Sequence, residues 1–226
     1  MLNTESLNRD DTVVLHEPFS FLAASGQLPD SAQGMLDSDF PRYASAGFFP
    51  YEPADCGASI NQLVDELTGP AFSNAIGARL GIEGLGNFPT LITICRTLNK
   101  RHGTIHTDSQ SKIATALIYL NESWPETSDG CLRFLRRADS IDDMVIPEIR
   151  PVYGNLVAFR RSSNSYHGHL PYEGERRVIQ VAWLLNEDEK LRKTRRGKFS
   201  RLFKKLFGAI DRRIGARRKN NASHLD

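Results

Sequence analysis

The sequence predicts a mainly β protein whose helices are confined to its N-terminal part. Five short β-rich runs follow one another after residue 89, and no helical pattern separates them. Turn-forming stretches such as "ETSDG" and "PYEGE" stand between the runs. This order favours an antiparallel sandwich or jelly roll over parallel βαβ units. At 226 residues, the chain is long enough for one sizeable domain with its own core.

The first 89 residues are expected to be mixed, with at least two helices. The stretch "INQLVDELTGPAFSNAIGARLG" has helical spacing of its apolar residues, and Pro70 interrupts it. The stretch "LPDSAQGMLDSDF" precedes it and carries a similar spacing. The runs expected as strands then cover residues 90–98, 113–120, 131–135, 152–159 and 177–185.

Composition limits the class of protein. An apolar fraction of 40% indicates a globular chain, not a disordered one. The three cysteines are odd in number and lack metal-site spacing, which favours a reducing compartment over a disulfide scaffold. The chain starts with polar residues, and no stretch approaches about 18 consecutive apolar residues. We therefore expect a cytoplasmic protein that does not span a membrane.

Charge divides the chain into an acidic body and a basic tail. Residues 190–226 hold 14 Lys and Arg against two Asp, whereas residues 1–189 hold 15 Lys and Arg against 25 Asp and Glu. This asymmetry and the order of the expected elements predict one domain over residues 1–187, with helices to about residue 89 and a jelly-roll core from about 90, and a separate basic tail over residues 188–226.

The tail has the pattern of an amphipathic helix. Its apolar residues fall on one helical face and its Lys and Arg on the other; they are Phe199, Leu202, Phe203, Leu206, Phe207, Ile210 and Ile214. Such a helix can lie in an anionic membrane interface through residues 198–219, which makes the protein a peripheral membrane protein. It can instead dock on the acidic body. Contact with nucleic acid is disfavoured because the apolar face is continuous.

A candidate metal site combines two separated stretches. His106 and Asp108 lie two apart in "RHGTIHTDSQ", so on an extended chain their side chains point the same way. His167 lies about sixty residues later in "SYHGHLPYEGERR", and His169 is a second choice that periodicity alone does not separate from it. Two imidazoles and one carboxylate leave open positions on a metal ion, as in non-haem Fe(II) oxygenases.

The set formed by His106, Asp108, His167 and Arg177 resembles that of the Fe(II)- and 2-oxoglutarate-dependent dioxygenase superfamily, in particular its prolyl-hydroxylase-like branch. The resemblance covers about residues 90–186. Supporting matches are "YLN" at 119–121, Trp124 with "DGCL" at 129–132, Gly154 and Trp183. One departure is Arg96, which stands where that branch often has a tyrosine.

The resemblance implies a double-stranded β-helix, Fe(II) held by His106, Asp108 and His167, and hydroxylation coupled to conversion of 2-oxoglutarate and O2 to succinate and CO2. His167 fits the family's interval to the arginine better than His169 does. His169 is then an outer-sphere residue, a substrate contact or a plain surface histidine.

Arg177 is expected to bind the distal carboxylate of 2-oxoglutarate, because a guanidinium pairs with both carboxylate oxygens and stays charged when buried. It shares strand parity with Ile179, Val181 and Trp183, the face taken to be the interior, whereas Arg176 is expected to be solvated.

Tyr119 is expected to add a hydroxyl to the same carboxylate, on a face shared with Thr115, although a plain core tyrosine fits almost as well. The expected substrate is a small molecule or a glycan or lipid-linked sugar. The rival interpretation is a non-catalytic jelly-roll binding protein that its tail recruits to membranes, and a buried arginine at the family's interval from the metal histidine favours the enzyme.

Overall fold

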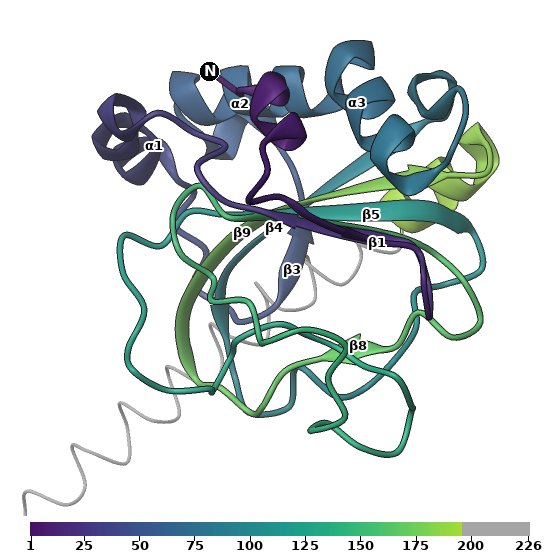
Figure 1. Cartoon of the computed structure of the whole chain (residues 1–226). Helices are drawn as coiled ribbons and strands as arrows, with labels where there is room; N and C mark the ends of the chain where they lie inside the picture. The colour runs from purple at the N-terminus through teal and green to yellow at the C-terminus, as the bar shows by residue number, and fades with distance from the viewer. Residues whose placement is uncertain (196–226) are drawn as a thin grey trace, which may run out of the picture.

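The computed structural model of the chain describes residues 1–195 and shows three layers (Figure 1). Helices cover one face of a seven-stranded sheet, while a two-stranded sheet and long loops cover the other. The strands are β1 (Val13–Leu15), β2 (Phe21–Ala24), β3 (Phe48–Pro50), β4 (Thr90–Leu98), β5 (Lys112–Tyr119), β6 (Arg133–Phe134), β7 (Leu156–Arg160), β8 (His167–Gly168) and β9 (Gly174–Leu184).

The large sheet has the order β1-β2-β7-β5-β9-β4-β3, and the small sheet pairs β6 with β8. Each strand pair within the two sheets is antiparallel. The predicted antiparallel β architecture with N-terminal helices is therefore confirmed, and it is consistent with a jelly roll. Each of the five predicted runs overlaps a strand. The short strands β1, β2, β3 and β8 were not predicted, because two to four residues are too few to show a period.

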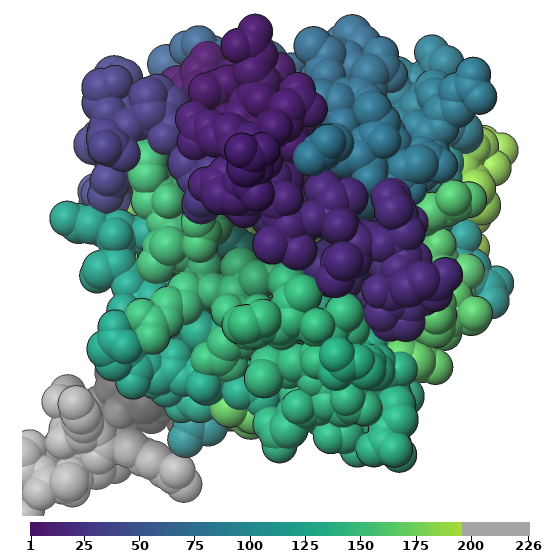
Figure 2. All heavy atoms as spheres, in the orientation of Figure 1, coloured from purple at the N-terminus to yellow at the C-terminus, as the bar shows by residue number. Residues whose placement is uncertain are grey.

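The helices are α1 (Gln33–Asp39), α2 (Ala58–Thr68) and α3 (Pro70–Leu80), accompanied by the 3-10 turns η1 (Thr4–Asn8), η2 (Asp30–Ala32), η3 (Pro53–Asp55) and η4 (Leu85–Asn87). The helical pattern is interrupted at Pro70, as predicted: α2 ends at Thr68 and Pro70 starts α3, since its ring suits the first helical position and its missing N–H costs nothing there. Gly81 closes α3 in the left-handed conformation, with φ 67°. In the space-filling view, the purple and blue N-terminal residues cover one side of the molecule and the green middle of the chain forms the opposite side (Figure 2).

Two apolar cores lie on the two faces of the large sheet. The core beneath the helices includes Ile179, Val181 and Trp183 of β9. Trp183 is fully buried, stacks on Phe72 of α3 with ring centroids 6.1 Å apart, and donates a hydrogen bond to Ser73 Oγ at 3.0 Å. These contacts fix the helical layer against the centre of the sheet.

The core on the other face is aromatic. Phe134 packs on Phe21 and Phe159, with ring centroids 4.5 and 5.7 Å away. Phe159 in turn packs on the imidazole of His167 at 4.5 Å. Aromatic packing thus holds the small sheet over the large one, and His167, a candidate metal ligand, is part of that packing.

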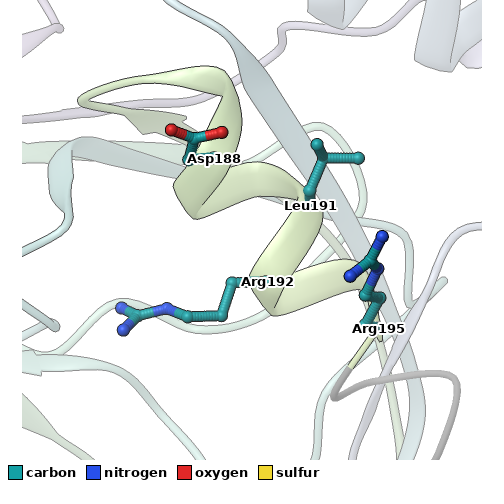
Figure 3. A pocket seen from close by; sticks show the side chains of 4 residues that line it. All are labelled: Asp188, Leu191, Arg192 and Arg195. Carbon is teal, nitrogen blue, oxygen red and sulfur yellow. The ribbon is translucent and has the colours of Figure 1, made fainter.

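After β9 the chain turns into a helix that the structure describes over residues 187–195. Asn186 caps it by accepting a hydrogen bond from the Glu189 amide at 3.0 Å. Leu191 and Arg192 lie on its exposed side, along a shallow surface pocket (Figure 3). The predicted amphipathic segment 198–219 lies outside the described residues. Within residues 1–195, none of the helices has the length and apolar character needed to cross a lipid bilayer.

We predict that Trp183→Ala lowers the free energy of unfolding by about 3–5 kcal/mol, because it removes a fully buried indole from between α3 and β9. Urea unfolding followed by circular dichroism measures the loss. Leu185→Ala is the control, since Leu185 is 53% exposed at the end of the same strand and should change stability by no more than about 0.5 kcal/mol. Equal losses for the two variants would contradict the packing described for the helical layer.

Candidate metal and co-substrate site

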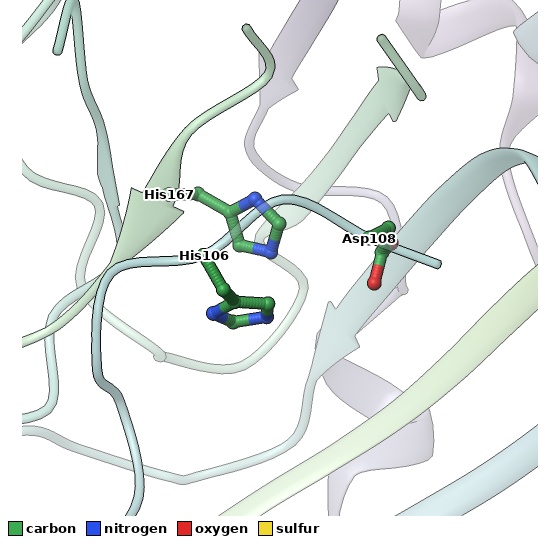
Figure 4. Close-up of side chains that lie close together, drawn as sticks. All are labelled: His106, Asp108 and His167. Carbon is green, nitrogen blue, oxygen red and sulfur yellow. The ribbon is translucent and has the colours of Figure 1, made fainter. Parts of the chain in front are cut away.

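His106 and His167 come from separate segments that pair through their backbones. His106 lies in the loop before β5 and His167 in β8; each amide donates to the other residue's carbonyl at 3.0 Å. The two imidazole rings are 4.4 Å apart. Asp108 points toward them from the loop (Figure 4), and one donor atom from each of the three residues lies within 4.8 Å of the others.

Backbone carbonyls set the tautomer of both imidazoles. His106 Nδ1 is 2.8 Å from the carbonyl of Thr104, and His167 Nδ1 is 3.0 Å from that of Ser165. A carbonyl oxygen only accepts, so each Nδ1 carries the proton and each Nε2 keeps its lone pair. This is the arrangement found for metal-bound histidines, in which an outer hydrogen bond orients the ring.

Asp108 is held as a carboxylate although it is buried. Burial raises its pKa, but the ammonium of Lys112 at 2.8 Å, the nearby His167 and the Thr115 hydroxyl at 2.5 Å together lower it to about 2. Burial lowers the pKa of His167 to about 4, and the Asp108 carboxylate opposes that shift only in part. At neutral pH Asp108 therefore offers an anionic oxygen and His167 a neutral nitrogen. With the imidazole of His106 they form a donor set that fits a divalent transition metal.

A cavity of about 350 Å³ opens beside the three residues. It lies between the large and small sheets, with Leu117, Leu132 and Phe159 among its apolar walls. His106, Asp108 and His167 line it, and so does Arg176 of β9. A ligand in this cavity contacts the metal-binding residues and the guanidinium at the same time.

Arg176 is the cation of the cavity, and the prediction that it is solvated was wrong. Its side chain is 2% exposed, and its Nε donates to the Gly130 carbonyl at 2.9 Å. Its Nη2 donates to the Tyr119 hydroxyl at 3.3 Å, and its guanidinium lies 5.1 Å from the Tyr119 ring. None of the described acidic side chains forms an ion pair with it. A buried guanidinium without a counter-ion favours an anionic ligand.

Arg177 lies on the opposite face of β9, so the prediction that it reaches the pocket was also wrong. Its guanidinium pairs with Asp37 of α1 and with Glu175 at 2.6 Å, and it lies over the Phe40 ring at 5.8 Å. The face that it shares with Ile179 and Trp183 is interior as predicted, but it is buried under the helices and not in the cavity. Both faces of β9 are covered, and the more apolar face is the one that packs on the helical layer.

Tyr119 and Thr115 both lie at the site, but they make different contacts. The Tyr119 hydroxyl is next to Arg176, and burial raises its pKa above the ordinary value. Thr115 lines the cavity, yet its hydroxyl is committed to Asp108. Tyr119 is thus placed beside the cation, whereas Thr115 supports the metal-binding carboxylate.

His169 lies in the cavity wall but outside the group of three metal-binding residues. Its Nδ1 donates to the Leu170 carbonyl at 2.7 Å, and burial, assisted by the charge of Arg176, lowers its pKa to about 4. Gly103 packs directly on its ring: a Cβ there would come within 2.2 Å of the imidazole, and the φ of 91° is one that favours glycine. Gly103 thereby leaves room for the His169 ring in the cavity wall.

Several cavity residues were missed from the sequence. They are Phe48, Thr93, His102, Gln180 and Arg176 itself. One signal was present: Gln180 is a polar residue inside an apolar strand, and Arg176 and Val178 share its parity. A polar side chain on one face of a doubly buried strand marks the face that lines a polar cavity.

Residues 92–185 match the family model described as "2OG-Fe(II) oxygenase superfamily". A comparison with curated proteins found no match. Among solved structures, a Pseudomonas putida prolyl-4-hydroxylase is similar in fold, with a TM-score of 0.51, 20% identity, and coverage of 73% of this chain and 92% of that chain. A viral collagen prolyl hydroxylase from Paramecium Bursaria Chlorella virus-1 aligns with a TM-score of 0.49 and 15% identity, over 78% of this chain and 94% of that one.

The matched residues span the metal-binding loop, the cavity and the strand that carries Arg176. The family implies Fe(II) as the metal and 2-oxoglutarate with O2 as co-substrates, which agrees with a His-Asp-His donor set. The match over residues 92–185, together with the His-Asp-His site, supports a 2-oxoglutarate-dependent dioxygenase of the 2OG-Fe(II) oxygenase superfamily.

Proposed function

We propose that the protein hydroxylates its substrate with Fe(II) held by His106, Asp108 and His167 and with 2-oxoglutarate held by Arg176. The observation that carries this proposal is the single cavity shared by the metal donor set and a buried guanidinium that has no acidic partner. Bound Fe(II) supplies the centre at which O2 is reduced while 2-oxoglutarate is oxidised to succinate and CO2. The chain supplies orientation, charge complementarity and exclusion of water.

Arg176 and Tyr119 are suited to hold the distal carboxylate of 2-oxoglutarate. The guanidinium pairs with an anion by charge-assisted hydrogen bonds, and the Tyr119 hydroxyl can donate a further one because its oxygen already accepts from Arg176. The apolar walls at Leu117 and Phe159 suit the methylene carbons between the two ends of the co-substrate.

The substrate proposed is a small molecule or a glycan, including a lipid-linked sugar. Polar groups on the β4 side of the cavity support a hydroxyl-rich ligand: Thr93, Gln180 and His102 line that side, and the Thr93 hydroxyl is buried without a hydrogen-bond partner. Phe48 lines the cavity from the edge strand β3 and remains partly exposed, which offers a ring face to a sugar or an aliphatic group.

We also propose that residues 198–219 bind an anionic membrane surface. The support is the sequence pattern, in which seven apolar residues share one helical face and Lys and Arg fill the other. Such attachment would bring the cavity near a lipid-linked substrate.

For the metal site, His106→Ala, Asp108→Ala and His167→Ala should each weaken Fe(II) binding by more than the roughly 10–100-fold typical of losing an outer partner, because each removes a donor atom. Anaerobic Fe(II) titration and succinate formation after O2 addition measure this. His169→Ala should keep most of the iron affinity, and His16→Ala, at an exposed histidine, is the control. Loss of iron in His169→Ala with retention in His167→Ala would reverse the ligand assignment.

For the co-substrate, Arg176→Met should cost about 2–5 kcal/mol of 2-oxoglutarate affinity, because it removes a desolvated charge pair. Arg177→Met is the matched control, since that side chain already pairs with Asp37 and Glu175 on the other face. Calorimetric titration of 2-oxoglutarate into the metal-loaded protein measures the affinity of each variant. A larger effect at Arg177 would overturn the assignment of Arg176.

For the tail, the full chain should sediment with anionic vesicles, and binding should fall as salt rises, because each Lys or Arg near the surface adds about 1 kcal/mol. The double change Phe203→Asp with Phe207→Asp should abolish sedimentation. A chain that ends at Arg195 should still form succinate from 2-oxoglutarate. Vesicle binding that survives the double change would rule out insertion of the apolar face.

A further inference from the structure

Both oxygens of the metal-binding carboxylate are already engaged by the chain itself. The Lys112 ammonium donates to Asp108 Oδ1 at 2.8 Å, and the Thr115 hydroxyl donates to Oδ2 at 2.5 Å. The ion pair is largely buried, with the Lys112 and Asp108 side chains 11% and 10% exposed. A metal ion that takes an oxygen of Asp108 must share the carboxylate with a cation or displace it.

The Lys112 charge has no second acid within the described residues, since its ion pair is with Asp108 alone. When a dication binds, the ammonium therefore faces two further positive charges in a poorly solvated place, which raises the free energy of the bound state. When the metal is absent, the same ammonium compensates a carboxylate that would otherwise be buried without a counter-ion, which lowers the free energy of the empty state. Both effects lower the affinity of the site for the metal ion.

We propose that Lys112 is an internal competitor of the metal ion, a residue that stabilises the metal-free site and sets a weak, exchangeable affinity for the dication. This inference rests on the proposed metal site. It makes Lys112 different from a residue that only orients a metal ligand, whose loss typically weakens metal binding by about 10–100-fold. Loss of a competing cation should instead strengthen metal binding.

A second cation approaches the same loop from the C-terminal helical segment. Lys193 Nζ donates to Ser109 Oγ at 3.3 Å, next to Asp108 in sequence, and the Leu185 amide donates to the Ser111 carbonyl at 3.1 Å. Lys193 contacts a hydroxyl instead of the carboxylate. Its removal should therefore change metal affinity in the same direction as removal of Lys112, but by less.

The test is a Co(II) titration of the full chain, read by visible absorption and by calorimetry. Co(II) accepts the same nitrogen and oxygen donors and supports no turnover in the absence of O2 and co-substrate. Lys112→Met should bind Co(II) at least about tenfold more tightly than the wild type, the reverse of the loss expected from an orienting residue. Lys112→Arg, which keeps the charge, should stay within about threefold of the wild type, a shift well under 1.4 kcal/mol. Lys100→Met, at an exposed lysine with the same change in net charge, should not differ from the wild type.

Thermal unfolding gives a second readout that needs no activity. In the presence of EDTA, Lys112→Met should melt below the wild type, because Asp108 loses its counter-ion. Added Co(II) should then raise its melting temperature by more than it raises that of the wild type, since tighter binding stabilises the folded state further. Lys112→Gln, checked for folding by circular dichroism, repeats the test if the Met variant does not fold.

Two outcomes distinguish failure of the competitor role of Lys112 from failure of the proposed metal site. Unchanged or weaker Co(II) binding in Lys112→Met and Lys112→Gln, with normal binding by the wild type, would overturn the competitor role and leave the metal site standing. Absence of Co(II) binding in the wild type and in every variant would overturn the proposed metal site, and this inference with it.

Discussion

The antiparallel pairing of β9 between β4 and β5 is the constraint on which the rest of the structure depends. Because β9 is covered on both faces, its side chains point alternately into the helical layer and toward the cavity. Trp183 packs under α3, while Gln180 and Arg176 line the cavity. The same alternation separates Arg176 from Arg177, so two adjacent and chemically identical side chains have different tasks. One has no acidic partner inside the cavity, and the other ties the strand to α1 through Asp37.

The two metal-binding histidines are positioned by backbone contacts, whereas side chains hold the Asp108 carboxylate. The paired amides and carbonyls of His106 and His167 join the loop before β5 to the small sheet. Carbonyls of Thr104 and Ser165 then orient the two rings and leave their Nε2 atoms free. Such outer hydrogen bonds set a ligand's orientation before the metal arrives, which limits the ordering that binding has to impose.

Charge is unequal along the cavity. At one end Asp108 carries a negative charge that Lys112 balances, and at the other Arg176 carries a positive charge that no described acidic side chain balances. A dicarboxylate therefore supplies the charge that the Arg176 end lacks, whereas a dication at the Asp108 end has to compete with Lys112. The loop that carries Asp108 also contacts the helix described over residues 187–195, through the hydrogen bond from Lys193 to Ser109.

The sequence by itself determined the positions of the longer strands, the break between α2 and α3, and the residues of the metal donor set. The strands and the break depend on local periodicity and on Pro70, and the pair His106 and Asp108 on its spacing. The family resemblance chose His167 over His169, which periodicity does not separate. Only the tertiary structure decided which arginine faces the cavity, because strand parity separates two faces without saying which layer covers each. It also decided that Lys112 reaches Asp108: that contact depends on the turn at Ser109–Ser111 and on the irregular register at the start of β5, and neither has a periodic signature in the sequence.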